Sequence, residues 1–168
     1  METHEKYIKP ITDNSIGNQI IVLFSLDELR FALYLSAVER IVRTVEITPL
    51  PKAPEIVMGV VNFHGEIIPV INIRKRFNLP AREIELDDQL IIARTSKRLV
   101  GLLVDSVSGV HELEHHQLTA TEGAFPYADY LSGIASIDND IVLIHDLEKF
   151  LSLDEQQVMD EVLSTGEK

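Results

Sequence analysis

The stretch GVVNFHGEIIPVINIRKRF, residues 59–77, predicts a β-hairpin at the centre of the fold. Its runs Val60–Phe63 and Glu66–Ile71 are rich in β-branched residues and flank the dipeptide His64-Gly65. A two-residue turn with glycine second suits a tight hairpin, because glycine adopts positive φ at little cost and histidine tolerates it better than most residues. Pro69 cannot donate to a strand ladder, so the second strand is expected at a sheet edge or beside a bulge.

The pattern of this stretch recurs later in the chain. MGVVNFHGEIIPVINIRKRFNL (58–79) aligns with SGIASIDNDIVLIHDLEKFLSL (132–153), and IVLFSLDELRFALYLSAV (21–38) aligns with LIIARTSKRLVGLLVDSV (90–107). Two repeats are too few for a solenoid, and many short strands with frequent turns are typical of small barrels or sandwiches. We therefore predict a mainly β fold.

The repeat predicts two similar β-barrel lobes within one domain of residues 19–153. Their cores are expected at about 19–80 and 89–153, with strands either kept within a lobe or exchanged between the lobes. Residues 1–18 are expected to form a flexible arm, and 154–168 a C-terminal helix and tail.

Short helical segments are expected at three places. Ser36, followed by Glu39, has the spacing of a capping box and predicts a short helix over Ala37–Arg43. One helical turn is expected at Ile73–Phe77. Asp154–Ser164 has the pattern of an amphipathic helix, whose apolar face comprises Val158, Met159, Val162 and Leu163.

Composition narrows the function classes. The formal net charge of −12 opposes binding to nucleic-acid phosphates and to anionic lipid, both of which need clustered Lys and Arg. The chain has no cysteine, which excludes disulfides and thiolate chemistry. No apolar run reaches the ~20 residues that span a bilayer. We expect a soluble, cytoplasmic protein without direct membrane insertion.

The pentapeptide HELEH matches the zinc motif H-E-x-x-H through His111, Glu112 and His115. A zinc-dependent hydrolase is therefore one alternative function. That motif needs a well-formed helix, whereas the preceding residues are β-branched and interrupted by Gly101 and Gly109, which favours extended chain.

Other catalytic interpretations are weaker. His145-Asp146 has the form of half a catalytic pair, but a helix start capped by the aspartate explains it better. Motifs for nucleotide binding and for a nucleophilic serine are missing from the sequence. We expect no enzyme activity and no catalytic residue, cofactor site or metal site.

Residues 59–77 resemble the central signature of the chemotaxis coupling family CheW, G-x-x-N-L-R-G-x-x-x-P-V-x-D-L-R, and the similarity extends over about residues 19–151. The resemblance implies two SH3-like five-stranded β-barrels. It also implies a non-enzymatic adaptor that links the cytoplasmic tip of chemoreceptors to the regulatory domain of a CheA-type histidine kinase. Receptor arrays at the inner membrane would recruit such a protein.

Several residues depart from the family pattern. His64 stands where arginine is usual, Phe63 replaces leucine, Arg40 takes the place of an acidic residue, and Asn72 replaces aspartate. Arginine offers a permanent forked charge that histidine lacks at neutral pH. The resemblance places the partner surface at a set of six residues: Val38, Arg40, Ile41, Phe63, His64 and Gly65.

Two interpretations of these departures stay open. Either the partners changed in compensation, or this adaptor serves a divergent pathway, such as pilus motility or another output. Neutral drift at the exposed positions is the simpler alternative to both. A separate alternative function is an orphan CheW-like module that modulates a kinase in a non-flagellar pathway.

Overall fold

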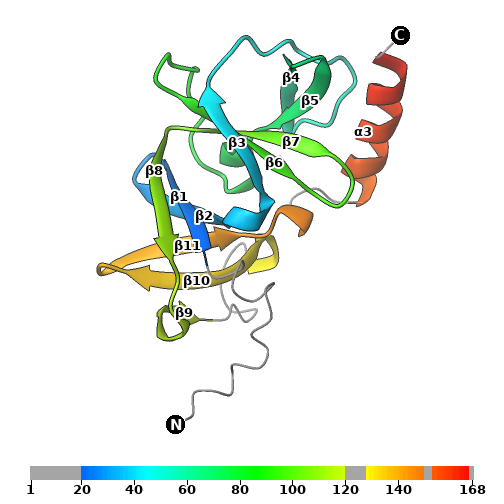
Figure 1. Ribbon diagram of the computed structural model, residues 1–168. Helices are drawn as coiled ribbons and strands as arrows, with labels where there is room; N and C mark the ends of the chain where they lie inside the picture. The colour runs from blue at the N-terminus through cyan, green and yellow to red at the C-terminus, as the bar shows by residue number, and fades with distance from the viewer. Residues whose placement is uncertain (1–19, 120–127, 150–152, 167–168) are drawn as a thin grey trace.

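A computed structural model describes residues 20–119, 128–149 and 153–166, which form a mainly β fold of two sheets (Figure 1). The first sheet has the order β8-β1-β2-β11-β10-β9, and the second β3-β6-β7-β5-β4. The strands are β1 (Ile20–Leu26), β2 (Leu29–Tyr34), β3 (Val38–Arg43), β4 (Val57–Phe63), β5 (Glu66–Ile71), β6 (Gln89–Arg94), β7 (Leu99–Val104), β8 (Ser106–Glu112), β9 (Leu118–Thr119), β10 (Leu131–Ile137) and β11 (Asp140–His145). The expected N-terminal arm lies outside the described residues.

The helical segments are short, apart from the last. They are the 3-10 helices η2 (Leu35–Ala37), η3 (His115–Gln117), η4 (Ala128–Tyr130) and η5 (Leu147–Lys149), and the α-helices α2 (Ile73–Arg76) and α3 (Leu153–Gly166). α2 lies where one helical turn was predicted, and the Asn72 side chain caps it by accepting a hydrogen bond from the Lys75 N–H.

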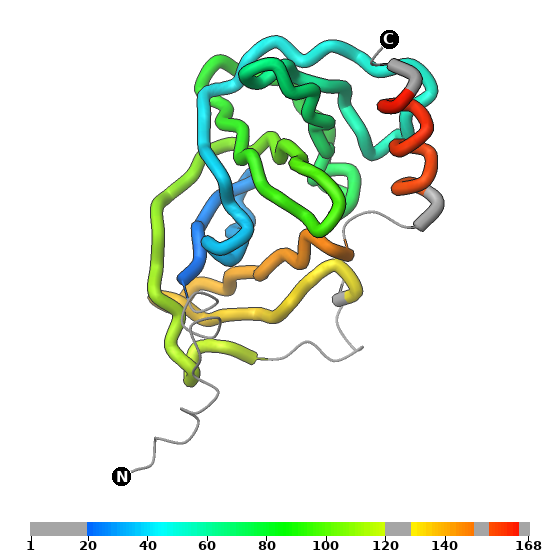
Figure 2. Tube along the Cα trace, turned by 45° about the vertical axis from the view of Figure 1, so that its right-hand side comes forward, coloured from blue at the N-terminus to red at the C-terminus, as the bar shows by residue number. Residues whose placement is uncertain are grey.

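Each sheet combines strands from both repeats (Figures 1 and 2). The hairpin β1–β2 lies beside β11 in the first sheet, whereas the hairpin β6–β7 lies beside β5 in the second. Both joining pairs, β2–β11 and β5–β7, are parallel. The sheets therefore do not follow the boundaries of about 19–80 and 89–153, because the first hairpin of each repeat is exchanged.

The two sheets return on themselves at equivalent places. After β3, the chain pairs Thr48 with Val60 of β4, and both backbone hydrogen bonds of this bridge form. After β8, the chain pairs Thr119 of β9 with Ile134 of β10. The first sheet has a sixth strand only because this returning segment is long enough to form β9.

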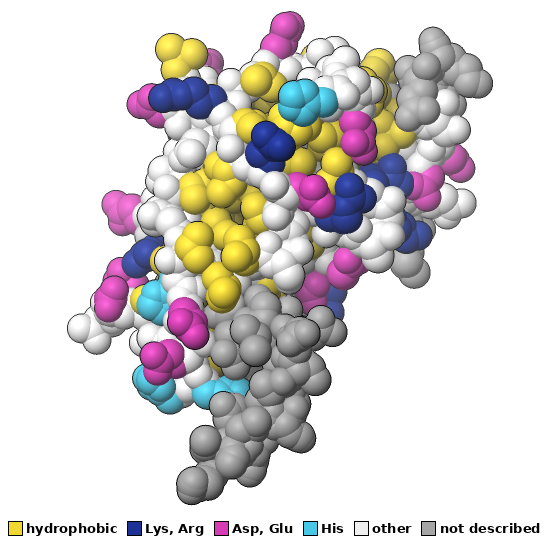
Figure 3. Space-filling view, in the orientation of Figure 1, with side chains coloured by type: hydrophobic (Ala, Val, Ile, Leu, Met, Phe, Trp, Pro, Cys, Tyr) yellow, Lys and Arg dark blue, Asp and Glu magenta, His cyan; other side chains and the backbone are white. Residues whose placement is uncertain are grey.

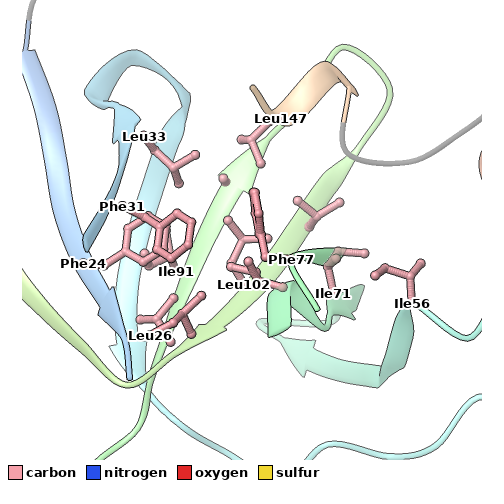
Figure 4. Packing of buried hydrophobic residues seen from close by; sticks show 14 of the residues in the cluster. Phe24, Leu26, Phe31, Leu33, Ile56, Ile71, Phe77, Ile91, Leu102 and Leu147 are labelled. Atoms are coloured by element: carbon pink, nitrogen blue, oxygen red, sulfur yellow. The ribbon is translucent and has the colours of Figure 1, made fainter. Parts of the chain in front are cut away.

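The largest hydrophobic cluster lies between the sheets and holds them together (Figure 4). Phe24 and Phe31 stack with ring centroids 5.7 Å apart, and Phe77 approaches Phe31 to 5.0 Å. Ile91 and Leu102 meet these rings from the exchanged hairpin β6–β7. Because burial of such side chains contributes about 1.5–3 kcal/mol each, the exchange makes the two lobes interdependent.

The predicted helix over Ala37–Arg43 is wrong. Only η2 is helical there, and β3 begins at Val38 and pairs antiparallel with β6. Val38 and Ile41 pack against the central cluster, so strand pairing and burial outweigh the local capping pattern.

The C-terminal helix was predicted over Asp154–Ser164 and is confirmed as α3. Met159 is fully buried and Leu163 nearly so. Arg76 pairs with Glu155 at 2.6 Å, and Arg98 pairs with Asp160. The helix is therefore fixed to the domain by apolar contacts together with two ion pairs.

An ionic cluster fastens the crossing from β7 to β8. Asp105 accepts hydrogen bonds from the backbone N–H of Asp27 at 2.7 Å, from Arg74 at 2.9 Å and from Arg82. Arg82 also pairs with Asp88 at 2.8 Å. Burial raises the pKa of Asp105, but these hydrogen bonds outweigh it and hold the pKa below its usual value.

Candidate functional site

The predicted surface residues come from two separate elements that meet in space. Arg40 lies on β3, while Phe63, His64 and Gly65 form the end of β4 and the β4–β5 turn. The Arg40 guanidinium lies 5.6 Å from the centroid of the Phe63 ring, and the His64 ring lies edge-on to Phe63 at 4.3 Å. Return of the chain from β3 to β4 brings this trio together.

The His64-Gly65 turn has the predicted geometry. His64 has φ of 53° and Gly65 has φ of 85°, and two positive φ values mark the turn that best matches the twist of a hairpin. The Gly65 N–H donates to the Asn62 side-chain oxygen at 2.9 Å. A Cβ at Gly65 would meet no atom within 4 Å, so the backbone conformation is the reason for glycine.

The six predicted residues differ in exposure. Arg40, His64 and Gly65 are exposed, whereas Val38, Ile41 and Phe63 are half-buried. Val38 and Ile41 pack against the cluster between the sheets. Phe63 packs against a separate cluster within the second sheet, which consists of Val61, Ile68, Val70, Leu90, Ile92 and Leu99. The exposed residues are therefore anchored on apolar residues that hold their positions.

Hydrophobic side chains gather in a band across the face that carries β3 and β8 (Figure 3). Contiguous apolar surface of this kind is typical of protein-binding sites. Val45, just after β3, is 49% exposed, and Val110 on β8 is 64% exposed. Sequence reasoning missed both residues, although the alternation of apolar and polar residues in β8 would have indicated Val110.

A groove of about 780 Å³ extends from the His64 turn along β5 towards α3. Its lining comprises His64, Gly65, Glu66, Ile67, Pro69, Arg98, Leu99 and Leu163. β5 lies inside the sheet order, but it pairs with β7 only through Val70 and Ile71. Pro69 therefore borders the half of β5 that has a partner strand on one side only, which reconciles a proline with an inner strand.

The zinc interpretation of HELEH fails on backbone geometry. His111 and Glu112 lie on β8, and His115 begins the 3-10 helix η3. The two histidines thus do not share one face of a helix, which the motif requires. Within the described ranges, no group of three His, Asp or Glu side chains is arranged to hold a metal ion.

The pair His145-Asp146 is structural. The Asp146 side chain accepts a hydrogen bond from the Glu148 N–H at 3.0 Å, so it caps η5 as expected of a helix start. His145 is buried between Phe31 and Phe77. Burial, aided by the positive charge of Arg76, lowers the pKa of His145 to about 3.

No helix among residues 20–119, 128–149 and 153–166 is long and apolar enough to cross a bilayer.

Comparisons with known proteins agree with the resemblance in sequence. A chemotaxis protein CheW of Thermotoga maritima is 31% identical over 78% of this chain and 86% of its own length. A chemotaxis protein CheW of Klebsiella aerogenes is 27% identical over 92% of this chain and 94% of its own.

The crystal structure of the scaffolding protein TtCheW from Thermoanaerobacter tengcongensis superposes with a TM-score of 0.76 at 30% identity. It covers 82% of this chain and 95% of that one. A sequence model of the CheW-like domain matches residues 21–155. This chain therefore belongs to the CheW-like domain family.

Proposed function

We propose that this chain is a non-enzymatic adaptor that couples chemoreceptors to a CheA-type histidine kinase. The observation that carries the proposal is the match of a CheW-like domain to residues 21–155, joined by 30% identity to a solved scaffolding protein of the same fold. The exposed apolar band and the anchored Arg40–Phe63–His64 trio fit a protein that other proteins bind.

The partner surface in this proposal is formed by Val38, Arg40, Ile41, Phe63, His64 and Gly65. Aromatic and arginine side chains carry much of the energy of protein interfaces, because they bury large areas and donate several hydrogen bonds. Phe63 and Arg40 are of these types, and they stack on each other. The apolar contacts of Val38 and Ile41 anchor β3 on the cluster between the sheets.

Binding to the cognate receptor tip and to the kinase regulatory domain tests the proposal. We expect the chain to bind both, and Phe63→Ala to weaken binding by about 10- to 30-fold. His64→Asn is a second variant at the same turn, because asparagine tolerates the positive φ of position 64 and the variant keeps the packing of Phe63 against the apolar residues of the second sheet. Ile141→Ala is the matched control, because it trims a side chain that is 60% exposed on β11.

If the folded wild-type chain binds neither partner, the proposal is wrong.

If the chain binds, kinase autophosphorylation distinguishes two adaptor roles. A coupling protein raises kinase activity with receptor, whereas an orphan module lowers it when it competes with the normal coupling protein.

The cellular location follows from the same proposal. The receptors would recruit this cytoplasmic adaptor to their arrays at the inner membrane. A fluorescent fusion is expected to form foci with the receptors and to become diffuse when the cognate receptor gene is deleted. Foci that persist after deletion would contradict recruitment by receptors.

A further inference from the structure

The ion pairs of the arginines single out one strand. The chain has eight arginines, and six of them pair with Asp or Glu: Arg30, Arg74, Arg76, Arg82, Arg94 and Arg98. The remaining two, Arg40 and Arg43, have no carboxylate partner among the described residues. Both are exposed, and both lie on β3.

Two arginines on one strand that pair with no described carboxylate are unexpected in a protein whose net charge is −12. The chain carries 27 Asp and Glu against 15 Lys and Arg, so acidic side chains are plentiful. Glu39 lies next to Arg40 in the sequence, yet its carboxylate pairs with Arg94 at 3.1 Å. Glu46 follows Arg43 by three residues and makes no ion pair with it within the described part of the chain. β3 therefore presents cations whose charge no carboxylate of the described residues compensates.

No carboxylate in the described part of the chain pairs with Arg40, which leaves its hydrogen-bond donors available. Its guanidinium carbon lies over the Phe63 ring, 5.6 Å from the centroid, and this contact helps to hold the group in place. The N–H groups around the edge of the planar guanidinium then suit a carboxylate, which accepts two of them in parallel. Holding the side chain in place lowers the entropy cost of binding.

β3 also offers an edge along which a partner segment can lie. β3 is at the end of its sheet and, among the strands that the structure describes, pairs with β6 alone. Alternation of side chains sends Arg40 and Arg43 to opposite faces of the strand, with the free edge between them. Val45, which is 49% exposed just beyond the strand, adds an apolar contact to the same edge.

We infer that β3 is a docking edge for an acidic segment of a partner protein, whose carboxylates pair with Arg40 and Arg43. The inference rests on the proposed adaptor function and adds the charge of the partner segment that this chain selects. Nucleic acid and anionic membrane are poorer occupants, because they require larger clusters of cations than two arginines in a protein of net charge −12.

Binding constants for the cognate kinase regulatory domain and receptor tip test the inference. Arg40→Glu and Arg43→Glu are each expected to weaken binding of one of these partners at least tenfold and to reduce its dependence on salt. Arg40→Gln and Arg43→Gln should weaken it less. Lys75→Glu makes the same change in net charge at an exposed position of α2, and is expected to change binding less than twofold.

The outcomes separate the two proposals. If the wild-type chain binds its partners and the arginine variants, shown by thermal unfolding to be folded, bind as well as Lys75→Glu, the docking edge is wrong and the adaptor function stands. If the wild-type chain binds neither partner, the adaptor function fails. Wild-type sedimentation with phosphatidylserine vesicles that Arg40→Glu abolishes would overturn the protein partner in favour of a membrane.

Discussion

β3 and β8 hold equivalent places in the two repeats. Each follows a first hairpin, forms an end of its sheet and leads into the segment that closes that sheet. Their side chains differ: β3 carries Arg40 and Arg43, whereas β8 carries Val110, His111 and Glu112. The repeat thus explains the backbone of both strands, and the side chains that each strand exposes determine what it can bind.

The largest expected effect concerns the glycines that allow the sheets to close. A Cβ on Gly59 would lie 2.3 Å from the carbonyl oxygen of Thr48, so Gly59→Ala must break the Thr48–Val60 bridge. We expect a loss of about 3 kcal/mol in the free energy of unfolding. Denaturant titration measures it.

The equivalent change in the other repeat is the matched control. A Cβ on Gly133 would first meet the end of the Leu118 side chain, which can move aside, at 2.9 Å. Gly133→Ala is therefore expected to cost only about 1 kcal/mol. Equal losses for the two variants would show that the two closures are equally tight.

The next largest effect concerns two places where the chain passes from one sheet to the other, between β7 and β8 and between β2 and β3. Asp105 accepts hydrogen bonds from Arg74 and Arg82, so Asp105→Ala leaves two partly buried guanidinium groups without this partner. We expect a loss of about 2 kcal/mol in unfolding free energy. Ser36 holds the equivalent place before β3, and Ser36→Ala, which removes an exposed neutral hydroxyl and not a carboxylate with two arginine partners, should cost less, about 1 kcal/mol. A smaller loss for Asp105→Ala than for Ser36→Ala would refute a fastening role for this cluster.

The ends of the second hairpins differ in their response to pH. His145 occupies the place that Ile71 has in the first repeat, and both side chains are buried. The pKa of His145 is about 3 in the folded chain and about 6.5 in the unfolded chain. Below about pH 6.5 the unfolded chain therefore binds more protons than the folded chain, which lowers the free energy of unfolding. The His145 contribution to stability is thus complete above pH 6.5 and is lost as the pH falls towards 3.

Replacement of His145 by its counterpart isolates this effect. Titration of one such group removes about 1.4 kcal/mol per pH unit, so His145→Ile should flatten the fall in stability between pH 6 and 4 by about that slope. Chemical denaturation at several pH values measures both proteins. Identical slopes would mean that His145 is accessible to protons in the folded state.

The smallest expected effect concerns the negative charge that lies next to Arg40 on β3. The Arg94–Glu39 pair is about half exposed on both sides, so Arg94→Gln should change stability by less than about 0.5 kcal/mol. It frees the carboxylate of Glu39 beside Arg40, and we expect partner binding to weaken about two- to threefold. Tighter partner binding by the variant would contradict an acidic occupant.

Local signals in the sequence predicted part of this architecture. The hairpin around His64-Gly65 and the repeat could be predicted, because turn residues and the alternation of apolar residues are local features of the sequence. The helix expected over Ala37–Arg43 failed, because pairing of β3 with β6 joins residues about 50 positions apart. The exchange of the hairpins β1–β2 and β6–β7 could not be predicted for the same reason. The two hairpins have similar sequence patterns, so each would suit either sheet, and the choice depends on contacts distant in the sequence.

The candidate site was predicted from family resemblance more than from local sequence pattern. The six residues were named from matching positions, but the stacking of Arg40 on Phe63 requires the closed second sheet. Arg40 and Arg43 stand out because the other arginines form ion pairs. Some of these pairs, such as Arg30 with Asp140, join elements distant in sequence, so sequence patterns do not indicate them. Charge composition alone gave −12 and concealed a basic strand.

The central claim is that partners dock on β3 and the β4–β5 turn, and the most direct measurement is an amide chemical-shift titration of the labelled chain with the cognate kinase regulatory domain and receptor tip. We expect the amides of residues 38–45 and 62–67 to shift or broaden most with at least one partner. Saturating additions of both partners that leave these amides unchanged, or that move only residues 106–112 of β8, would contradict the account.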